Sequence, residues 1–209
     1  MIWLYRAPFS TNVERVALAL AHKGLEVESI VISYEDRTPV QEASGQGLVP
    51  VIDDDGQMVA DSTRILGFLE ENYPQNPIFP ADPARRTEVE LVIDWFNEVW
   101  KSSPNAIEFE LEEGGEEPKM DIVQAEAERM RVGLGVFNRM LAGRDFLAGD
   151  SVSALDFVAF PFLKYAAMEP AEEDDELFHR ILDVHQPMDP EEHADLAAWI
   201  TRIDAMPRA

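Results

Sequence analysis

The residue pattern changes once along this chain, at a proline-rich segment, and the change divides the sequence into two unlike parts. Residues 74–83 carry four prolines in ten positions, which suits an ordered, non-helical connection. Before this segment, short apolar runs alternate with helical patterns, as in strands and helices packed about a sheet. After it, only long helical patterns appear. The sequence therefore predicts an α/β domain over residues 1–75, a linker over 76–83 and an all-α domain over 84–209.

The first part predicts the element order βαβ, an irregular stretch, ββ and α. Strands are expected over residues 2–5 and 26–32, on either side of a helix whose apolar residues recur from 13 to 20. The Asp55-Gly56 step is a strong hairpin signal between two further short strands. Ser62 occupies the expected N-cap position of the helix that follows them.

The second part predicts helices alone. They are expected over residues 84–100, 119–141, 153–168, 177–184 and 191–203. Ser153 and Asp156 have the spacing of a capping box at the start of one of them. Two acidic stretches, residues 108–117 and 169–176, are expected to be solvent loops or frayed helix ends.

Composition excludes several classes of function and partner. With a formal charge of −24, the chain would repel phosphate backbones and anionic membranes, so no nucleic acid and no membrane are expected as partners. The absence of cysteine excludes disulfides, thiolate metal sites and a cysteine nucleophile. The four histidines have no metal-ligand spacing, so no metal is expected. Without a membrane-spanning run or a signal-peptide layout, a cytoplasmic location is the simplest expectation.

Ser10 lies where a strand is expected to end and a helix to begin. Free backbone N–H groups and about half an elementary positive charge are concentrated at a helix N-terminus, so a thiolate near Ser10 would be stabilised relative to its thiol. Lowering a thiol pKa of about 8.5 by one unit needs only about 1.4 kcal/mol. The alternative is that Ser10 or Asn12 simply caps the helix, and spacing alone favours the cap.

A second polar site is predicted around Val49-Pro50 and Asp61-Ser62. A valine before proline is held extended, so its backbone groups stay free to pair with an extended, peptide-like ligand. A proline at a strand start also suits a cis peptide bond. Asp61 offers an acceptor for an ammonium group, and Ser62 with the helix N-terminus offers donors for a carboxylate.

These residues resemble the N-terminal domain of cytosolic glutathione transferases. Gly47-x-Val49-Pro50 before a strand, followed by an acid-serine pair that opens a helix, is similar to the family's glutathione-binding frame, with Asp61 where members usually have Glu. Residues 146–156 and 196–202 resemble segments of the family's helical domain. The resemblance implies a thioredoxin-like N-terminal domain (βαβ-ββα) followed by an all-helical C-terminal domain.

Carried over by position, the resemblance implies that Val49 pairs through its backbone with the cysteinyl part of glutathione, next to a cis Pro50. Asp61 and Ser62 would hold the γ-glutamyl end. Ser10 falls on the serine that donates to the thiol in serine-type classes such as zeta and tau.

Three neighbouring positions refine this comparison. Thr11 and Asn12 fall on the next two glutathione-binding positions, and Asn12 replaces a cysteine of the zeta class, which argues against a zeta-type isomerase. Tyr5 is the competing thiol donor, because tyrosine-type classes place theirs near the end of the first strand, although its spacing to Arg15 is one residue off. The lack of cysteine also argues against omega-like and glutaredoxin-like thiol transfer.

The expected function is a glutathione transferase that activates the glutathione thiol for attack on a small hydrophobic electrophile, with glutathione as co-substrate and no other cofactor. The electrophile is expected between the domains, near Phe9 and Trp100, although helical spacing favours a core or subunit-interface role for Trp100. The family is usually dimeric, so a homodimer is expected. Two alternatives stay open: a glutathione-dependent isomerase, reductase or dehalogenase, and a non-catalytic binding module on the same scaffold.

Overall fold

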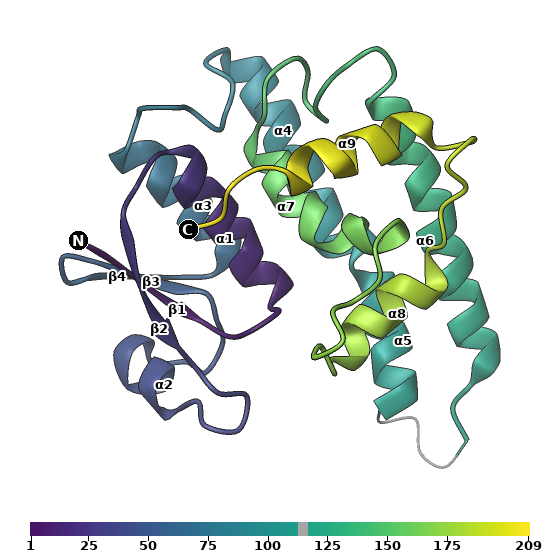
Figure 1. The fold of residues 1–209 in the computed structure, drawn as a ribbon, viewed down its shortest axis with the longest axis horizontal. Helices are drawn as coiled ribbons and strands as arrows, with labels where there is room; N and C mark the ends of the chain where they lie inside the picture. Colours follow the sequence, from purple (N-terminus) through teal and green to yellow (C-terminus); the bar gives the residue numbers. More distant parts are fainter. Residues whose placement is uncertain (113–116) are drawn as a thin grey trace. The chain divides into compact units, whose positions relative to one another are not determined.

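The computed structural model describes residues 1–112 and 117–209 (Figure 1). The chain forms two compact units, Met1–Ala81 together with Ala205–Ala209, and Asp82–Asp204. The passage from the first unit to the second falls inside the proline-rich segment, and the last residues return to the first unit. Residues 113–116, part of an acidic stretch expected as a loop, lie outside the described residues. Within the described residues, no helix is long and apolar enough to cross a membrane.

The first unit is built on a four-stranded sheet in the order β2-β1-β3-β4. The strands are β1 (Ile2–Arg6), β2 (Val27–Val31), β3 (Val51–Asp54) and β4 (Gln57–Ala60). β1 pairs in parallel with β2 and antiparallel with β3, and β3 and β4 form a hairpin. Its turn residues Asp55 and Gly56 have φ angles of 49° and 93°, which suit an Asp-Gly step. The predicted thioredoxin-like sheet and its hairpin are confirmed.

Three helices pack on this sheet: α1 (Thr11–His22), α2 (Thr38–Ser44) and α3 (Ser62–Asn72). Figure 1 shows α1 and α3 side by side on one face and α2 on the other. The sequence predicts an irregular stretch where α2 lies, and this prediction is wrong. α2 has seven residues and buries only Val40, so it is too short to give a helical period.

The N-cap of α3 is a second correction. The sequence places Ser62 at the cap, but Asp61 holds that position and its Oδ1 accepts a hydrogen bond of 2.9 Å from the backbone N–H of Arg64. Ser62 is the first residue of the helix and is buried. The shift of one position matters because it turns the hydroxyl of Ser62 toward α1 rather than along its own helix.

A buried ion pair fastens the end of α1 to α3. Lys23 Nζ lies 2.8 Å from Glu70 Oε2 and donates to the backbone carbonyl of Tyr73, also over 2.8 Å. Glu70 in turn accepts the backbone N–H groups of Ile78 and Phe79. One carboxylate therefore holds the proline-rich segment against the two helices.

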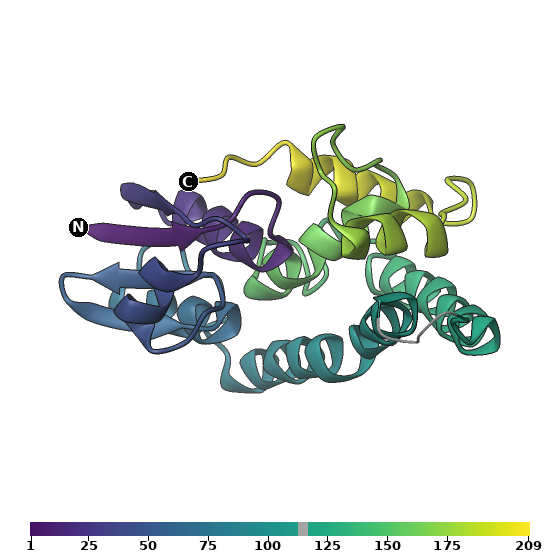
Figure 2. The same ribbon diagram turned by 90° about the horizontal axis from the view of Figure 1, so that it is seen from below.

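The regular secondary structure described in the second unit is helical, apart from an isolated β-bridge between Phe146 and Gly149. Its elements are α4 (Pro83–Trp95), a π-helical turn (Phe96–Trp100), α5 (Ser102–Glu112), α6 (Met120–Met140), α7 (Ala154–Leu163), a 3-10 turn (Lys164–Ala166), α8 (Leu177–His185) and α9 (Ala194–Asp204). Every residue of α7 is buried, and α4, α8 and α9 pack around it. α5 and α6 lie side by side in Figures 1 and 2.

α5 is the main difference from the expected helical domain. The sequence predicts no helix between residues 100 and 119, and a loop or frayed helix end from residue 108, whereas α5 occupies Ser102–Glu112. The buried positions of α5 are Ser103, Pro104, Ile107 and Glu110, of which one is a large aliphatic residue. An amphipathic period is therefore almost absent from the sequence of this helix.

The predicted capping box at the start of α7 is confirmed and extends further than a cap. Asp156 is fully buried, and its carboxylate accepts hydrogen bonds from Ser153 N and Oγ, Leu147 N and Trp199 Nε1, all between 2.8 and 2.9 Å. Burial raises the pKa of Asp156, while these hydrogen bonds act against that effect. One carboxylate thus joins α7, α9 and the segment before α7.

An aromatic cluster fixes the packing of α6. Phe96 stacks on Trp100 with ring centroids 4.7 Å apart, and both rings meet Phe137 edge-on. Trp100 lies so close to Gly133 that an added Cβ would stand 2.7 Å from its Nε1 and 2.9 Å from its Cδ1. The indole is buried and rigid, so it has little room to withdraw.

Gly133→Ala is therefore expected to lower the free energy of unfolding by about 1–3 kcal/mol through overpacking. Gly135→Ala on the same helix is the matched control, because its nearest neighbour, Arg139 Nη1, lies 3.5 Å from the added Cβ. That substitution should stabilise the helix by about 0.5–1 kcal/mol. Urea denaturation of both variants tests the pair, and equal effects would contradict the close approach.

The Lys23–Glu70 pair generates a pH prediction. Burial raises the pKa of the Glu70 carboxyl, but hydrogen bonds from Lys23, Ile78 and Phe79 outweigh it and hold the pKa below its ordinary value of 4.5. The stabilisation is therefore present above that value and is lost as the pH falls through the lower, folded-state pKa. Thermal midpoints of wild type and Glu70→Gln should differ most at neutral pH and converge in acid; a constant difference would contradict the assignment.

Candidate functional site

Two helix N-termini in the first unit begin at residues with unusual backbone angles. Phe9 has a φ of 59° and Asp61 a φ of 77°, in the region that L-residues rarely adopt. Each stands directly before one of the two hydroxyls that the sequence singles out, Ser10 and Ser62. Such conformations cost roughly 1–3 kcal/mol and gather where a fold holds a ligand or a reacting group, so both turns mark a candidate site.

Ser10 is the N-cap of α1. Its Oγ accepts the backbone N–H of Val13 over 3.4 Å, and its side chain is half-buried. The helix-cap interpretation is therefore confirmed. The cap is compatible with the stabilisation of a thiolate by Ser10, because Oγ is the acceptor in this contact and its own proton stays available for donation to an anion.

Thr11 and Asn12 form the first turn of α1. Thr11 is 6% exposed and Asn12 is half-buried. In the described part of the chain, neither side chain makes a hydrogen bond. The amide of Asn12 therefore has its full donor and acceptor capacity free beside the cap.

The Val49-Pro50 peptide bond is cis, as the sequence suggests, and Pro50 is buried directly ahead of β3. Val49 is half-buried and packs against Ile32, Val40 and Val51. Among the described residues, no hydrogen-bond partner is found for its backbone N–H or C=O. A residue directly before a strand with both backbone groups unpaired is suited to pairing with a peptide-like chain.

Arg15 connects the two helix N-termini, and the sequence analysis gives it no role in the candidate site. Its Nη1 donates to Ser62 Oγ over 3.2 Å, and the whole side chain is 2% exposed. Because Ser62 Oγ accepts this bond, its own proton is left for another acceptor. A charged residue between the buried Val13 and Val16 of an apolar helix is the one signal for it.

The charge of Arg15 bears on what this site can bind. Burial lowers the pKa of Arg15 to about 9, and the nearby carboxylate of Asp61 acts in the opposite direction. The guanidinium therefore keeps its positive charge at neutral pH. It adds to the partial positive charge of the α3 N-terminus, directly behind the hydroxyl of Ser62.

Asp61 and Ser62 together place a negatively charged acceptor next to a hydroxyl donor that is backed by the positive charge of Arg15. Asp61 is exposed, and its Oδ2 has no hydrogen-bond partner among the described residues, since Oδ1 makes the cap. Ser62, Arg15 and the helix N-terminus supply the donors and the positive charge. This arrangement suits a ligand head that carries an ammonium and a carboxylate on one carbon.

The other sequence-predicted residues lie elsewhere. Tyr5 is half-buried and packs against the cluster of Ile32, Val40 and Val51 beneath α2. Phe9 is 43% exposed in the first unit. Trp100 is 4% exposed and belongs to the aromatic cluster of the second unit, as its helical spacing favours.

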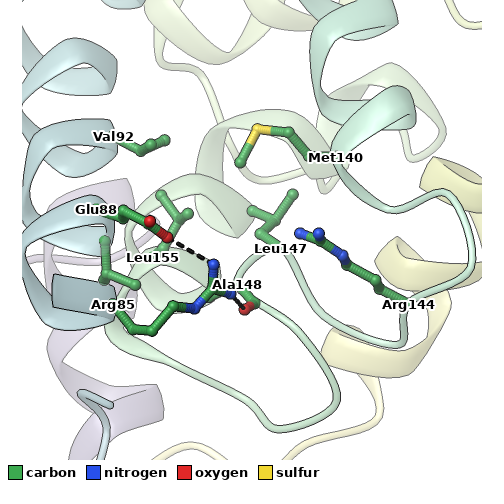
Figure 3. Close-up of a pocket in the computed structure, with 9 residues that line it drawn as sticks. Arg85, Glu88, Val92, Met140, Arg144, Leu147, Ala148 and Leu155 are labelled. Carbon is green, nitrogen blue, oxygen red and sulfur yellow. Dashed lines mark hydrogen bonds and ion pairs between the residues drawn. The ribbon is translucent and has the colours of Figure 1, made fainter. Parts of the chain in front are cut away.

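The second unit has a small hollow of its own, shown in Figure 3. It has a volume of about 100 Å³ and apolar walls formed by Val89, Val92, Met140, Leu147 and Leu155. Arg85 stands at its rim, bonded to Glu88 over 2.6 Å and to the carbonyl of Ala148 over 2.9 Å. None of the sequence-predicted site residues lines this hollow.

Comparison with known proteins supplies the family context. The family model "Glutathione S-transferase, N-terminal domain" matches residues 4–77, and "Glutathione S-transferase, C-terminal domain" matches residues 121–202. The chain is 29% identical over 166 residues to the pyrimidodiazepine synthase of Drosophila melanogaster; the match covers 76% of this chain but only 62% of that protein. It is 39% identical over 90 residues to the maleylacetoacetate isomerase of Pseudomonas aeruginosa. This match covers 40% of this chain and 42% of the isomerase.

Solved structures give the same fold. A glutathione S-transferase from Rhodospirillum rubrum superposes with a TM-score of 0.77, covering 99% of this chain and 89% of that one at 24% sequence identity. The arrangement of a thioredoxin-like unit followed by a helical unit is therefore shared along nearly the whole chain.

The backbone angle of Asp61 generates a stability prediction. Asp61→Gly removes the cap but relieves the positive φ, so the free energy of unfolding should stay the same or rise by up to about 1 kcal/mol. Asp61→Ala loses the cap and keeps the strain, so it should cost about 1–2 kcal/mol. Urea denaturation measures both, and equal losses would show that the turn stores no strain.

Proposed function

Because the chain belongs to the glutathione S-transferase family, we propose that it binds reduced glutathione and activates the sulfur for attack on a small hydrophobic electrophile. The carrying observation is the pair Asp61-Ser62 backed by the buried guanidinium of Arg15. The γ-glutamyl end of glutathione has an ammonium and a carboxylate on one carbon. Asp61 accepts from the ammonium, while Ser62 and the N-terminus of α3 donate to the carboxylate.

The backbone of Val49 holds the cysteinyl part of glutathione in this proposal. Its unpaired N–H and C=O groups are those an extended peptide needs for two strand-like hydrogen bonds. Thr11 and Asn12 complete the binding surface at the start of α1. No cofactor is required, because glutathione itself is the co-substrate.

Ser10 is the proposed thiol donor. Its Oγ accepts a hydrogen bond from Val13, so its hydroxyl proton can be donated to the thiolate. The N-terminus of α1 adds a partial positive charge that stabilises the same anion. A hydrogen bond to a charged group contributes about 1.5–3 kcal/mol, enough to lower a thiol pKa by about one to two units. Tyr5 is the weaker candidate, because its ring packs within the cluster beneath α2.

A glutathione-dependent isomerase is the second candidate function. The likeness to the maleylacetoacetate isomerase of Pseudomonas aeruginosa favours it, whereas Asn12 in place of the zeta-class cysteine weighs against it. Both reactions use the same activated sulfur, so the binding residues serve either. The electrophile, a homodimeric state and a cytoplasmic location are further parts of the proposal.

The first experiment is a thermal-shift titration of the purified protein with reduced glutathione. Binding to the native state should raise the midpoint with ligand concentration, whereas a binding module without this site should not respond. Glutathione conjugation to a reactive aryl halide then tests turnover, and product analysis with maleylacetoacetate tests isomerisation. No glutathione binding at all would overturn the proposal, and binding without either reaction would leave the non-catalytic module.

Substitution of the two candidate donors separates their roles. Ser10→Ala should lower kcat/KM for conjugation by about 10- to 100-fold, because it removes one hydrogen bond to the thiolate, and should change the glutathione Kd little. Tyr5→Phe removes the other hydroxyl at nearly constant volume and should behave as wild type. The reverse pattern would transfer the role to Tyr5.

A further inference from the structure

The chain's last residues lie along α1, in the first compact unit. The backbone N–H of Ala209 donates to the carbonyl of Ala17 over 3.1 Å, and Arg6 Nη1 donates to the carbonyl of Ala209 over 2.9 Å. In both Figures 1 and 2, the end marked C lies next to α1. The segment after α9 is therefore packed against the helix that begins at Ser10.

Arg208 makes the strongest contact of this segment. Its Nη2 and Nε donate to Glu14 Oε1 over 2.9 and 3.3 Å, and its Nη1 donates to the carbonyl of Met206 over 2.6 Å. The side chains are 25% and 16% exposed for Arg208 and Glu14. A pair this sheltered, with two N–H groups on one oxygen, is screened less by salt than a surface pair.

Glu14 stands one helical turn beyond the proposed thiol donor. Its backbone N–H donates to the carbonyl of Ser10 over 3.0 Å, so the two residues occupy positions i and i+4, on one face of α1. Because helical side chains lean toward the N-terminus, a carboxylate at position i+4 is expected to lie toward residue i. A negative charge there opposes the formation of a second one on sulfur.

Other charged groups near α1 have partners of their own. Arg15 donates to Ser62, Arg6 donates to Ala209 and Ser29, and Asp61 caps α3. Arg208 is a cation in direct contact with the carboxylate of Glu14. It comes from the far end of the sequence, 194 residues away.

We propose that Arg208 is a positioning residue for the thiol site: it holds and neutralises Glu14, so that the carboxylate does not oppose the negative charge on the glutathione sulfur beside Ser10. Arg208 touches no substrate in this role and acts through Glu14. The inference rests on the proposed function, since it presupposes a thiolate at Ser10. It adds a contribution from a segment outside the glutathione-binding frame.

The experiment measures the pKa of the thiol of protein-bound glutathione, from the ultraviolet absorbance of the thiolate as a function of pH. Arg208→Gln should raise this pKa by about half a unit to one unit, which lowers the thiolate fraction about three- to tenfold on the acid side. Arg208→Lys should restore most of the wild-type value because it keeps the charge. Glu14→Gln should lower the pKa below that of wild type, since the negative charge is removed while the positive charge of Arg208 remains.

The double variant Glu14→Gln, Arg208→Gln is the matched control. With both charges removed, the thiol pKa should return close to the wild-type value, which a loss of local packing would not produce. If Arg208→Gln does not fold, an unchanged pKa in Glu14→Gln is enough to overturn the inference.

The outcomes separate this inference from the proposed function. Wild-type protein that binds no glutathione would overturn both. A second outcome is that wild-type protein binds and ionises glutathione, and that Arg208→Gln and Glu14→Gln have the same thiol pKa as wild type. This result would overturn the role of Arg208 alone, and the segment after α9 would then have only a structural role.

Discussion

The buried hydrogen bond from Arg15 to Ser62 joins the N-terminal parts of α1 and α3, and the geometry of the candidate site depends on it. Removing a guanidinium from water is costly unless it finds partners, so the bond fixes how the two helices pack. Since burial lowers the pKa of Arg15 only to about 9, the same side chain also holds a positive charge behind the α3 N-terminus. One contact therefore serves packing and anion recognition together.

Buried charged groups play a comparable joining role at two other places in the chain. Lys23 and Glu70 hold the proline-rich segment against α1 and α3, and Asp156 gathers donors from three segments of the helical unit. In each case the charge is surrounded by several hydrogen bonds, which is the condition for burying it without a large loss. These groups add specific polar links between helices to the apolar cores of the two units.

The alternating and helical patterns of the sequence predict the sheet, its Asp-Gly hairpin, α1, α3, the long helix α6 and the capping box at Ser153 and Asp156. They miss α2, which buries only Val40, and the whole of α5, whose buried side includes Ser103, Pro104 and Glu110. Periodicity reports apolar residues that face a core, and neither helix has enough of them.

The candidate site was also predicted only in part. Ser10, Val49, Asp61 and Ser62 stand at turns that the sequence marks, whereas Arg15 appears in the sequence only as a charge within an apolar helix.

The sequence by itself determined the approximate positions of the strands of the sheet, of α1, α3 and α6 and of the capping box at Ser153, because those signals lie within a few neighbouring residues. It also determined the residue types at the two helix N-termini. Only the tertiary structure decided that Asp61 rather than Ser62 caps α3, that Arg15 reaches Ser62, and that Arg208 reaches Glu14. The contacts of Arg15 and Arg208 depend on which charged group finds which partner across the fold, and such a choice is made by packing between segments that are distant in the chain.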